Sequence, residues 1–122
     1  MAEHNETGFA GEKLAVEWLT VHGYKIRQEN WRYRHLEVDI IAEKGDTLHF
    51  IEVKTRMSLA QGMPYEAVHY WKQQKMIKMA FSYLKFKFGT IEIASRFDVI
   101  SIYRDPSGEN HIEHIVNAFN CS

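Results

Sequence analysis

Short apolar segments alternate with polar, glycine-containing turns along most of the chain, and their spacing predicts strands and helices. Segments 36–43 and 47–55 are rich in β-branched and aromatic residues, which favour β-strands. Gly45 and Asp46 lie between them and have the composition of a two-residue hairpin loop. The two segments are therefore expected to form an antiparallel hairpin.

Helical spacing of apolar residues predicts two helices. The first covers about residues 7–22 and is stopped by Gly23. The second covers 65–88, is expected to be irregular in its first turn or two, and ends at Gly89. The other expected elements are strands over 24–33, 96–104 and 111–116, the last at a sheet edge, and a loop over 57–64. The predicted order is α-β-β-β-α-β-β, an α/β fold.

Composition suits one compact domain, 1–122, because the chain has 122 residues and 45 % apolar content. No apolar run approaches the ~18 residues of a membrane helix, and no signal peptide is apparent, so a cytoplasmic protein without a membrane span is expected. The single cysteine, Cys121, excludes an intrachain disulfide. Neither a Gly-rich phosphate loop nor a Ser/His/Asp or Cys/His arrangement is present, which argues against nucleotide hydrolysis and acyl transfer.

Acidic residues in the hairpin are the main candidates for chemistry. Counting outward from the turn places Asp39 across from Glu52 and Glu37 across from Lys54, all on one face. Two facing carboxylates repel each other unless a positive charge lies between them, and carboxylate oxygens suit Mg²⁺ or Mn²⁺. Lys54 can then hold the attacking water and offset charge on a phosphate.

A solvated strand face, with Glu37 and Lys54 as a cross-strand pair, is the alternative for these charged residues. Apolar residues on both faces of the hairpin argue against it, because they predict a hairpin covered on both sides. The apolar residues expected on the opposite face are Val38, Ile40 and Ala42, and those expected on the acidic face are Ile41, Leu48 and Phe50.

Charge is distributed unevenly, although the formal net charge is only -1. The segment 67–91 contains no Asp or Glu, and its lysines recur at helical spacing. The lysines that can share one stripe of the helix are Lys72, Lys75, Lys78 and Lys85. This stripe either follows a phosphate backbone or is an ordinary solvated face.

Histidines and exposed aromatics are weaker candidates. His111 and His114 have no cysteine or carboxylate at zinc-like spacing, and an i, i+3 pair in a strand points to opposite faces, so a zinc site is not expected. Several aromatic side chains can stack on unpaired bases, although core or surface packing is their commoner role. These aromatics are Trp31, Tyr33, Tyr65, Tyr70 and Trp71.

The arrangement D-x12-E-V-K, from Asp39 to Lys54, resembles the PD-(D/E)xK nucleases, and the whole chain is similar to the YraN-like family of that superfamily. The other matching blocks are Gly11-Glu12, Ala15, Trp18-Leu19, Gly23-Tyr24, Asn30-x-Arg32, Gly62-x-Pro64, Glu66-Ala67-Val68, Lys72, Ala80, Tyr83-Leu84, Arg96-Phe97-Asp98-Val99 and Asn117-Ala118-Phe119. Val38 replaces the proline that often precedes the superfamily's Asp, and Leu36 replaces a glycine common in the family. Neither change removes a catalytic side chain.

This resemblance implies a restriction-endonuclease-like fold, with a central mixed sheet flanked by helices. It implies a Mg²⁺-dependent nuclease in which Asp39 and Glu52 bind the metal and Lys54 positions the water. Glu12 on the first helix is expected to assist near the metal, because apolar neighbours turn it toward the sheet. The alternative for Glu12 is an early-turn glutamate favoured by the helix dipole.

The resemblance also indicates nucleic-acid contacts. Lys72 is expected beside the strand that carries Glu52 and Lys54, with Gln73 close to it. The further candidates for phosphate contact are Arg32, Arg34, Arg56, Lys75 and Lys78. The expected function is phosphodiester hydrolysis in DNA during repair, recombination or processing, and a homodimer would suit duplex cleavage. The alternative is a nucleic-acid-binding module that keeps the fold and cuts nothing.

Overall fold

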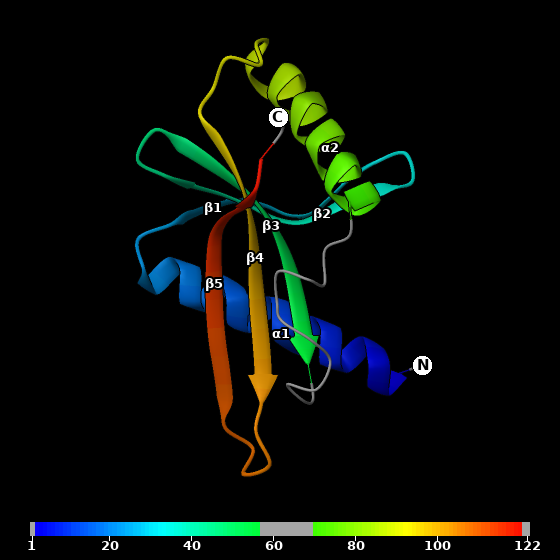
Figure 1. Ribbon diagram of the computed structural model, residues 1–122, viewed down its shortest axis with the longest axis vertical. Helices are drawn as coiled ribbons and strands as arrows, with labels where there is room; N and C mark the ends of the chain where they lie inside the picture. Colours follow the sequence, from blue (N-terminus) through cyan, green and yellow to red (C-terminus); the bar gives the residue numbers. More distant parts are fainter. Residues whose placement is uncertain (1, 57–69, 121–122) are drawn as a thin grey trace.

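The computed structural model describes residues 2–56 and 70–120, with side chains described for 11–55 and 70–120. These residues form a five-stranded sheet and two helices in the predicted order (Figure 1). The elements are α1 (Ala2–Val21), β1 (Lys25–Tyr33), β2 (Leu36–Lys44), β3 (Thr47–Arg56), α2 (Tyr70–Phe88), β4 (Ser95–Arg104) and β5 (Asn110–Phe119).

The sheet is mixed, and its strands follow the chain order from β1 to β5. Only β3 and β4 pair in parallel, and the connection between them carries α2, as a parallel pair requires. The other neighbouring strands are antiparallel. The expected α/β class, mixed sheet and order are therefore confirmed, and β5 is an edge strand as predicted.

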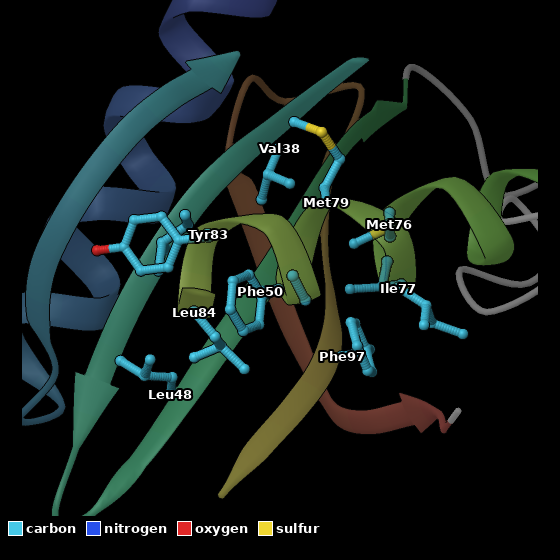
Figure 2. Close-up of a cluster of buried hydrophobic side chains, with 12 residues drawn as sticks. Val38, Leu48, Phe50, Met76, Ile77, Met79, Tyr83, Leu84 and Phe97 are labelled. Carbon is cyan, nitrogen blue, oxygen red and sulfur yellow. The ribbon is translucent and has the colours of Figure 1, made fainter. Parts of the chain in front are cut away.

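Each face of the sheet is covered by one helix (Figures 1 and 2). Under α2, Met76, Met79 and Tyr83 pack in a buried cluster with Ile41 and Phe50 of the sheet. Under α1, a second cluster contains Ala15, Leu19, Ile40, Ala42, Ile51, Ile100 and Ile102. Because fully burying a large apolar side chain stabilises a fold by about 1.5–3 kcal/mol, these clusters fix both helices on the sheet.

Glycine ends the first helix as the sequence predicts. Gly23 has φ 89°, and its N–H donates to the Thr20 carbonyl at 3.2 Å, while the Tyr24 N–H donates to the Leu19 carbonyl at 2.9 Å. This pair of hydrogen bonds satisfies the carbonyls at the end of a helix. The helix begins at Ala2, five residues before the expected start.

The turn of the central hairpin also forms as the sequence predicts. Lys44 and Thr47 are Cα partners, so Gly45 and Asp46 form the predicted two-residue loop. Gly45 has φ 61°, a conformation that glycine adopts without steric cost. The expected loop 57–64 and the expected helical turns at 65–69 lie outside the described residues.

Candidate active site

The carboxylate of Asp39 lies where strands β2 and β3 separate. Cα partners of these strands run from Lys44 and Thr47 to Ile40 and Ile51. Beyond that pair, the N–H of Val53 donates to Asp39 Oδ2 at 2.8 Å. The carboxylate therefore takes a backbone hydrogen bond from β3, and this bond holds Asp39 beside Glu52 and Lys54.

Separation of the strands corrects the expected position of Glu37 across from Lys54. Glu37 is instead the Cα partner of Arg32 on β1, and Arg32 Nε donates to Glu37 Oε2 at 2.6 Å. Lys54 pairs with Glu52. Cross-strand counting fails here because it assumes that the ladder continues past Ile40.

A second correction concerns Val38, which was expected on the same face as Ile40 and Ala42. Val38 packs in the cluster under α2, together with Ile41, so the alternation of faces is interrupted between them. On the neighbouring strand Asn30 lies across from this interruption and has φ 52°. Asparagine tolerates this left-handed conformation better than most residues.

Two lysines flank the carboxylate of Glu52, which is only 6 % exposed. Lys54 Nζ lies 3.5 Å from Glu52 Oε1. Lys72 Nζ lies 3.8 Å from Glu52 Oε2 and comes from the first turn of α2. The structure thus brings a helix lysine, a strand lysine and a buried carboxylate into one group, next to Asp39.

Mutual repulsion of carboxylates is evident at this group. Burial, together with the charges of Glu52, Glu12 and Glu37, raises the pKa of Asp39 to about 8, although the hydrogen bond from the Val53 N–H acts in the opposite direction. Burial also raises the pKa of Glu12, opposed by a hydrogen bond with Asn30. Since nearby negative charges disfavour ionisation, a cation bound here would favour the charged carboxylates.

A glycine allows the first helix to approach this group. A Cβ atom at Gly11 would collide with Thr55 Oγ1 near the end of β3. Without a side chain at this position, α1 lies against β3, and the following residue, Glu12, reaches the carboxylate group. Because α1 begins at Ala2, Glu12 lies in the middle of the helix, so the alternative of an early-turn glutamate is wrong.

The candidates for nucleic-acid contact are spread over α2, β1 with the turn that follows it, and the end of β3. On α2, Lys75 and Lys78 are exposed, whereas Lys72 and Gln73 are half-buried. Lys75 Nζ lies 4.5 Å from the centroid of the Trp71 ring. On β1, Arg32 is paired with Glu37, and Arg34 in the following turn is exposed. Arg56 ends β3 opposite Tyr103, and its side chain is outside the described part of the chain.

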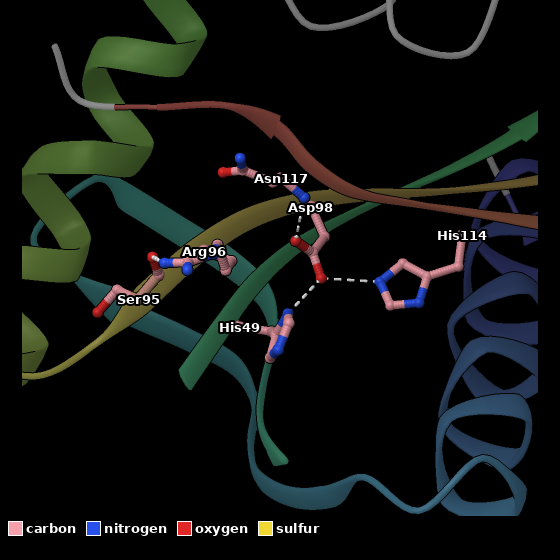
Figure 3. Close-up of polar contacts among 6 residues, drawn as sticks. All are labelled: His49, Ser95, Arg96, Asp98, His114 and Asn117. Carbon is pink, nitrogen blue, oxygen red and sulfur yellow. Dashed lines mark hydrogen bonds and ion pairs between the residues drawn. The ribbon is translucent and has the colours of Figure 1, made fainter. Parts of the chain in front are cut away.

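A buried network around Asp98 was not expected from the sequence (Figure 3). Asp98 has no exposed surface, and its Oδ2 accepts from His49 Nδ1 at 2.6 Å and from His114 Nε2 at 2.7 Å. Its Oδ1 accepts from the N–H of Asn117 at 2.9 Å. These hydrogen bonds outweigh the effect of burial and lower the pKa of Asp98.

This network connects the edge strand β5 to its neighbours. The register between β4 and β5 shifts between Phe97 and Val99, and Asn117 has φ 56°. The Asp98 carboxylate binds the N–H at that bulge, so it joins three strands. The two histidines and Asp98 also form a donor set that could hold a metal ion, as do Asp105, Glu109 and His111.

The sequence offered one clue to this network, a charged residue at Asp98 inside the apolar segment 97–100. The prediction that His111 and His114 point apart is confirmed, because His111 contacts Asp105 at 2.8 Å and His114 contacts Asp98. Although neither histidine has a carboxylate at zinc-like spacing along the sequence, each contacts one in the folded chain. The contacts of His111 with Asp105 and of His114 with Asp98 could not be inferred from the spacing of these residues along the sequence.

Comparisons with known proteins identify one family. The family described as "Uncharacterised protein family UPF0102" matches residues 11–102. A UPF0102 protein of Chlorobium phaeobacteroides is 48 % identical over 117 residues, covering 92 % of this chain and 91 % of the relative. UPF0102 proteins of Bacteroides thetaiotaomicron and Flavobacterium johnsoniae are each 44 % identical, covering 98 % of this chain and 96 % and 98 % of those relatives.

The matched range contains the whole carboxylate group. It begins at Gly11, directly before Glu12, and includes Asp39, Glu52 and Lys54.

Among the described residues, no helix is long and apolar enough to cross a membrane.

Proposed function

Because the chain belongs to the UPF0102 family, the YraN-like group, and carries Asp39, Glu52 and Lys54 side by side, we propose that it is a metal-dependent nuclease acting on DNA. The observation that carries the proposal is the position of Asp39. It is half-buried at the point where two strands part, and it is held there by a backbone N–H. A fold gains little from such a carboxylate unless the carboxylate has a task.

Asp39 and Glu52 are the residues that would hold a divalent cation, Mg²⁺ or Mn²⁺. Carboxylate oxygens are the ligands these ions prefer, and the pKa of Asp39 is raised by burial and by neighbouring negative charge, which a cation would compensate. When bound, the cation supplies positive charge beside the scissile phosphate and lowers the pKa of a water molecule. Glu12 adds a third carboxylate at the edge of this group.

The lysines complete the proposed site. Lys54 and Glu52 are alternate residues of one strand, so they project from the same side of β3. The Lys54 ammonium holds the attacking water and stabilises charge that develops on the phosphate. Lys72 supplies a second ammonium from α2. Hydrolysis forms one P–O bond from water and breaks one P–O ester bond, whose oxygen leaves with a proton.

A non-catalytic DNA-binding module is the second candidate. The observation that favours it is the pairing of both Glu52 oxygens with lysine, because these ion pairs already compensate the carboxylate without a metal ion. In such a module the lysines would contact phosphate while Asp39 stayed protonated. The two candidates differ in whether any DNA is cut.

Incubation of the purified protein with single-stranded, duplex, flapped and four-way-junction DNA separates them. Each substrate is tested with Mg²⁺, with Mn²⁺ and with chelator, and Lys54→Met is the matched control. The nuclease predicts products that require the metal and are lost in the control. Absence of any product above the control on every substrate, with DNA binding retained, would assign the chain to the binding module.

A further inference from the structure

A pocket of about 230 Å³ opens between the turn that joins β1 to β2 and the first half of α2. Leu36, Met76 and Met79 give it apolar walls. Trp71 lines it with a ring that is 59 % exposed, and Lys75 lies over that ring at 4.5 Å. An aromatic plane, a cation and apolar walls are therefore presented to solvent together.

Lys72 links this pocket to the proposed catalytic group. It lines the pocket, and its ammonium lies 3.8 Å from Glu52 Oε2. A molecule in the pocket would therefore lie one lysine side chain away from Glu52. The acidic residue in the pocket wall, Glu37, is paired with Arg32 at 2.6 Å, which compensates its charge toward an anion.

Unpaired nucleotides match this combination of groups. Proteins that hold single strands stack bases on aromatic side chains and place lysines or arginines along the phosphates. The base needs an apolar, flat surface, which Trp71 and the methionines supply, and its phosphate needs Lys72 or Lys75. A base inside a duplex is stacked on both faces and paired at its edge, so it cannot enter such a pocket.

We propose that this pocket receives one unpaired nucleotide next to the scissile phosphate, so that DNA with a single-stranded segment is bound and cut in preference to intact duplex. The preference in cutting rests on the proposed nuclease function. The preference in binding does not, because it follows from the pocket alone.

Binding in chelator tests the pocket without cleavage. Trp71→Ala is expected to weaken affinity for a single-stranded oligonucleotide about 5- to 150-fold, as loss of one base stack costs about 1–3 kcal/mol, and to leave affinity for blunt duplex unchanged. Trp71→Phe should restore much of the loss. Phe86→Ala, which removes a 75 % exposed aromatic from the far end of the same helix, is the matched control and should bind as the wild type does.

A fluorescent base identifies the contact directly. An oligonucleotide with 2-aminopurine in its single-stranded segment should lose fluorescence on binding the wild type and Phe86→Ala, and should lose much less with Trp71→Ala. Equal quenching by all three proteins, or an equal loss of single-strand and duplex affinity in Trp71→Ala, would overturn the proposal.

The same variants separate this inference from the nuclease proposal. Quenching that depends on Trp71, on a protein that cuts no DNA, would support the pocket and refute the nuclease. Metal-dependent cleavage that favours single-stranded segments equally in wild type and Trp71→Ala would support the nuclease and refute the pocket. Because Trp71 is largely exposed, its substitution is not expected to unfold the domain.

Discussion

Burial and charge act on the Asp39 carboxylate in the same direction. Loss of water disfavours its ionised form, and the carboxylates of Glu52, Glu12 and Glu37 disfavour it further. Only the Val53 N–H favours the charge among the causes of this shift. Without a bound cation, the surroundings of Asp39 therefore favour the neutral carboxyl group over the carboxylate.

Stability of the metal-free protein should therefore fall as the pH rises from about 4 to about 8. The pKa of Asp39 is raised from 3.8 to about 8, so the folded protein binds more protons than the unfolded chain over this interval. Stability decreases with pH wherever the folded state binds more protons. Asp39→Asn removes this contribution and should flatten the profile. Urea unfolding of both proteins in chelator, at about pH 5 and about pH 8.5, checks it, and an equal decline in both would contradict it.

Asp98 shows the opposite dependence, because its hydrogen bonds lower its pKa. Its contribution to stability should be present above the unfolded pKa of 3.8 and be lost as acid protonates the folded carboxylate. Asp98→Asn should lower the free energy of unfolding by about 1–3 kcal/mol for each buried donor it leaves unpaired. Urea unfolding at neutral pH measures this loss. Asp105→Asn, at an exposed turn, is the control, and equal losses in both would show that burial of the network is unimportant.

Among the structural elements, α2 carries lysines near both of its ends. Lys72 and Lys75 line the pocket near Glu52, whereas Lys85 and Lys87 lie in the last turn of the helix. Met76, Met79, Ala80, Tyr83 and Leu84 are buried on one face of α2, and the exposed lysines follow from the same helical spacing.

Replacing Lys72, Lys75 and Lys78 with glutamine should weaken DNA affinity about equally for all sequences, because phosphate contacts carry no sequence information. Loss of three phosphate contacts should reduce the slope of log affinity against log salt by roughly 2–3. Titrations at several salt concentrations in chelator measure this slope. Lys85→Gln with Lys87→Gln is the control at the other end of the helix. An unchanged slope in the triple variant would assign the stripe to solvation.

The features of these elements that were predictable from the sequence depend on residues close together along the chain. The hairpin loop at Gly45 and the helix end at Gly23 depend on neighbours within a few residues, and both were predictable. The face of Val38 was not, because it depends on the parting of β2 and β3 and on the conformation of Asn30. Counting along a ladder cannot reveal where the ladder ends.

The same distinction applies to the sites. Asp39, Glu52 and Lys54 were predictable as neighbours because a short hairpin joins them. His49, Asp98 and His114 come from three strands that only the folded sheet brings together. The expectation that Lys72 lies beside Glu52 came from the family resemblance, because 16 residues lie between Lys72 and Thr55, the end of the predicted hairpin strand.

At the scale of the whole molecule, two helices cover opposite faces of one sheet and both reach the same carboxylate group. Gly11 lets α1 approach β3, and the first turn of α2 brings Lys72 to Glu52. The proposed site is therefore assembled from four elements, α1, β2, β3 and α2, on a packed scaffold, which suits a group of residues that must be held in place. The proposed nuclease function requires that Asp39 binds a metal ion.

Metal binding by Asp39 can be tested with melting curves of the wild type and Asp39→Asn, recorded with Mn²⁺ and with chelator. An ion that binds only the folded state stabilises it in proportion to occupancy, and the amide is a much poorer ligand. Mn²⁺ should raise the melting temperature of the wild type and have a smaller effect on the variant. In chelator the variant should be as stable as the wild type or more stable, by about 0.2–1 kcal/mol, because repulsion with Glu52 is relieved. Equal shifts with Mn²⁺, or unfolding of Asp39→Asn, would show that Asp39 is a structural residue.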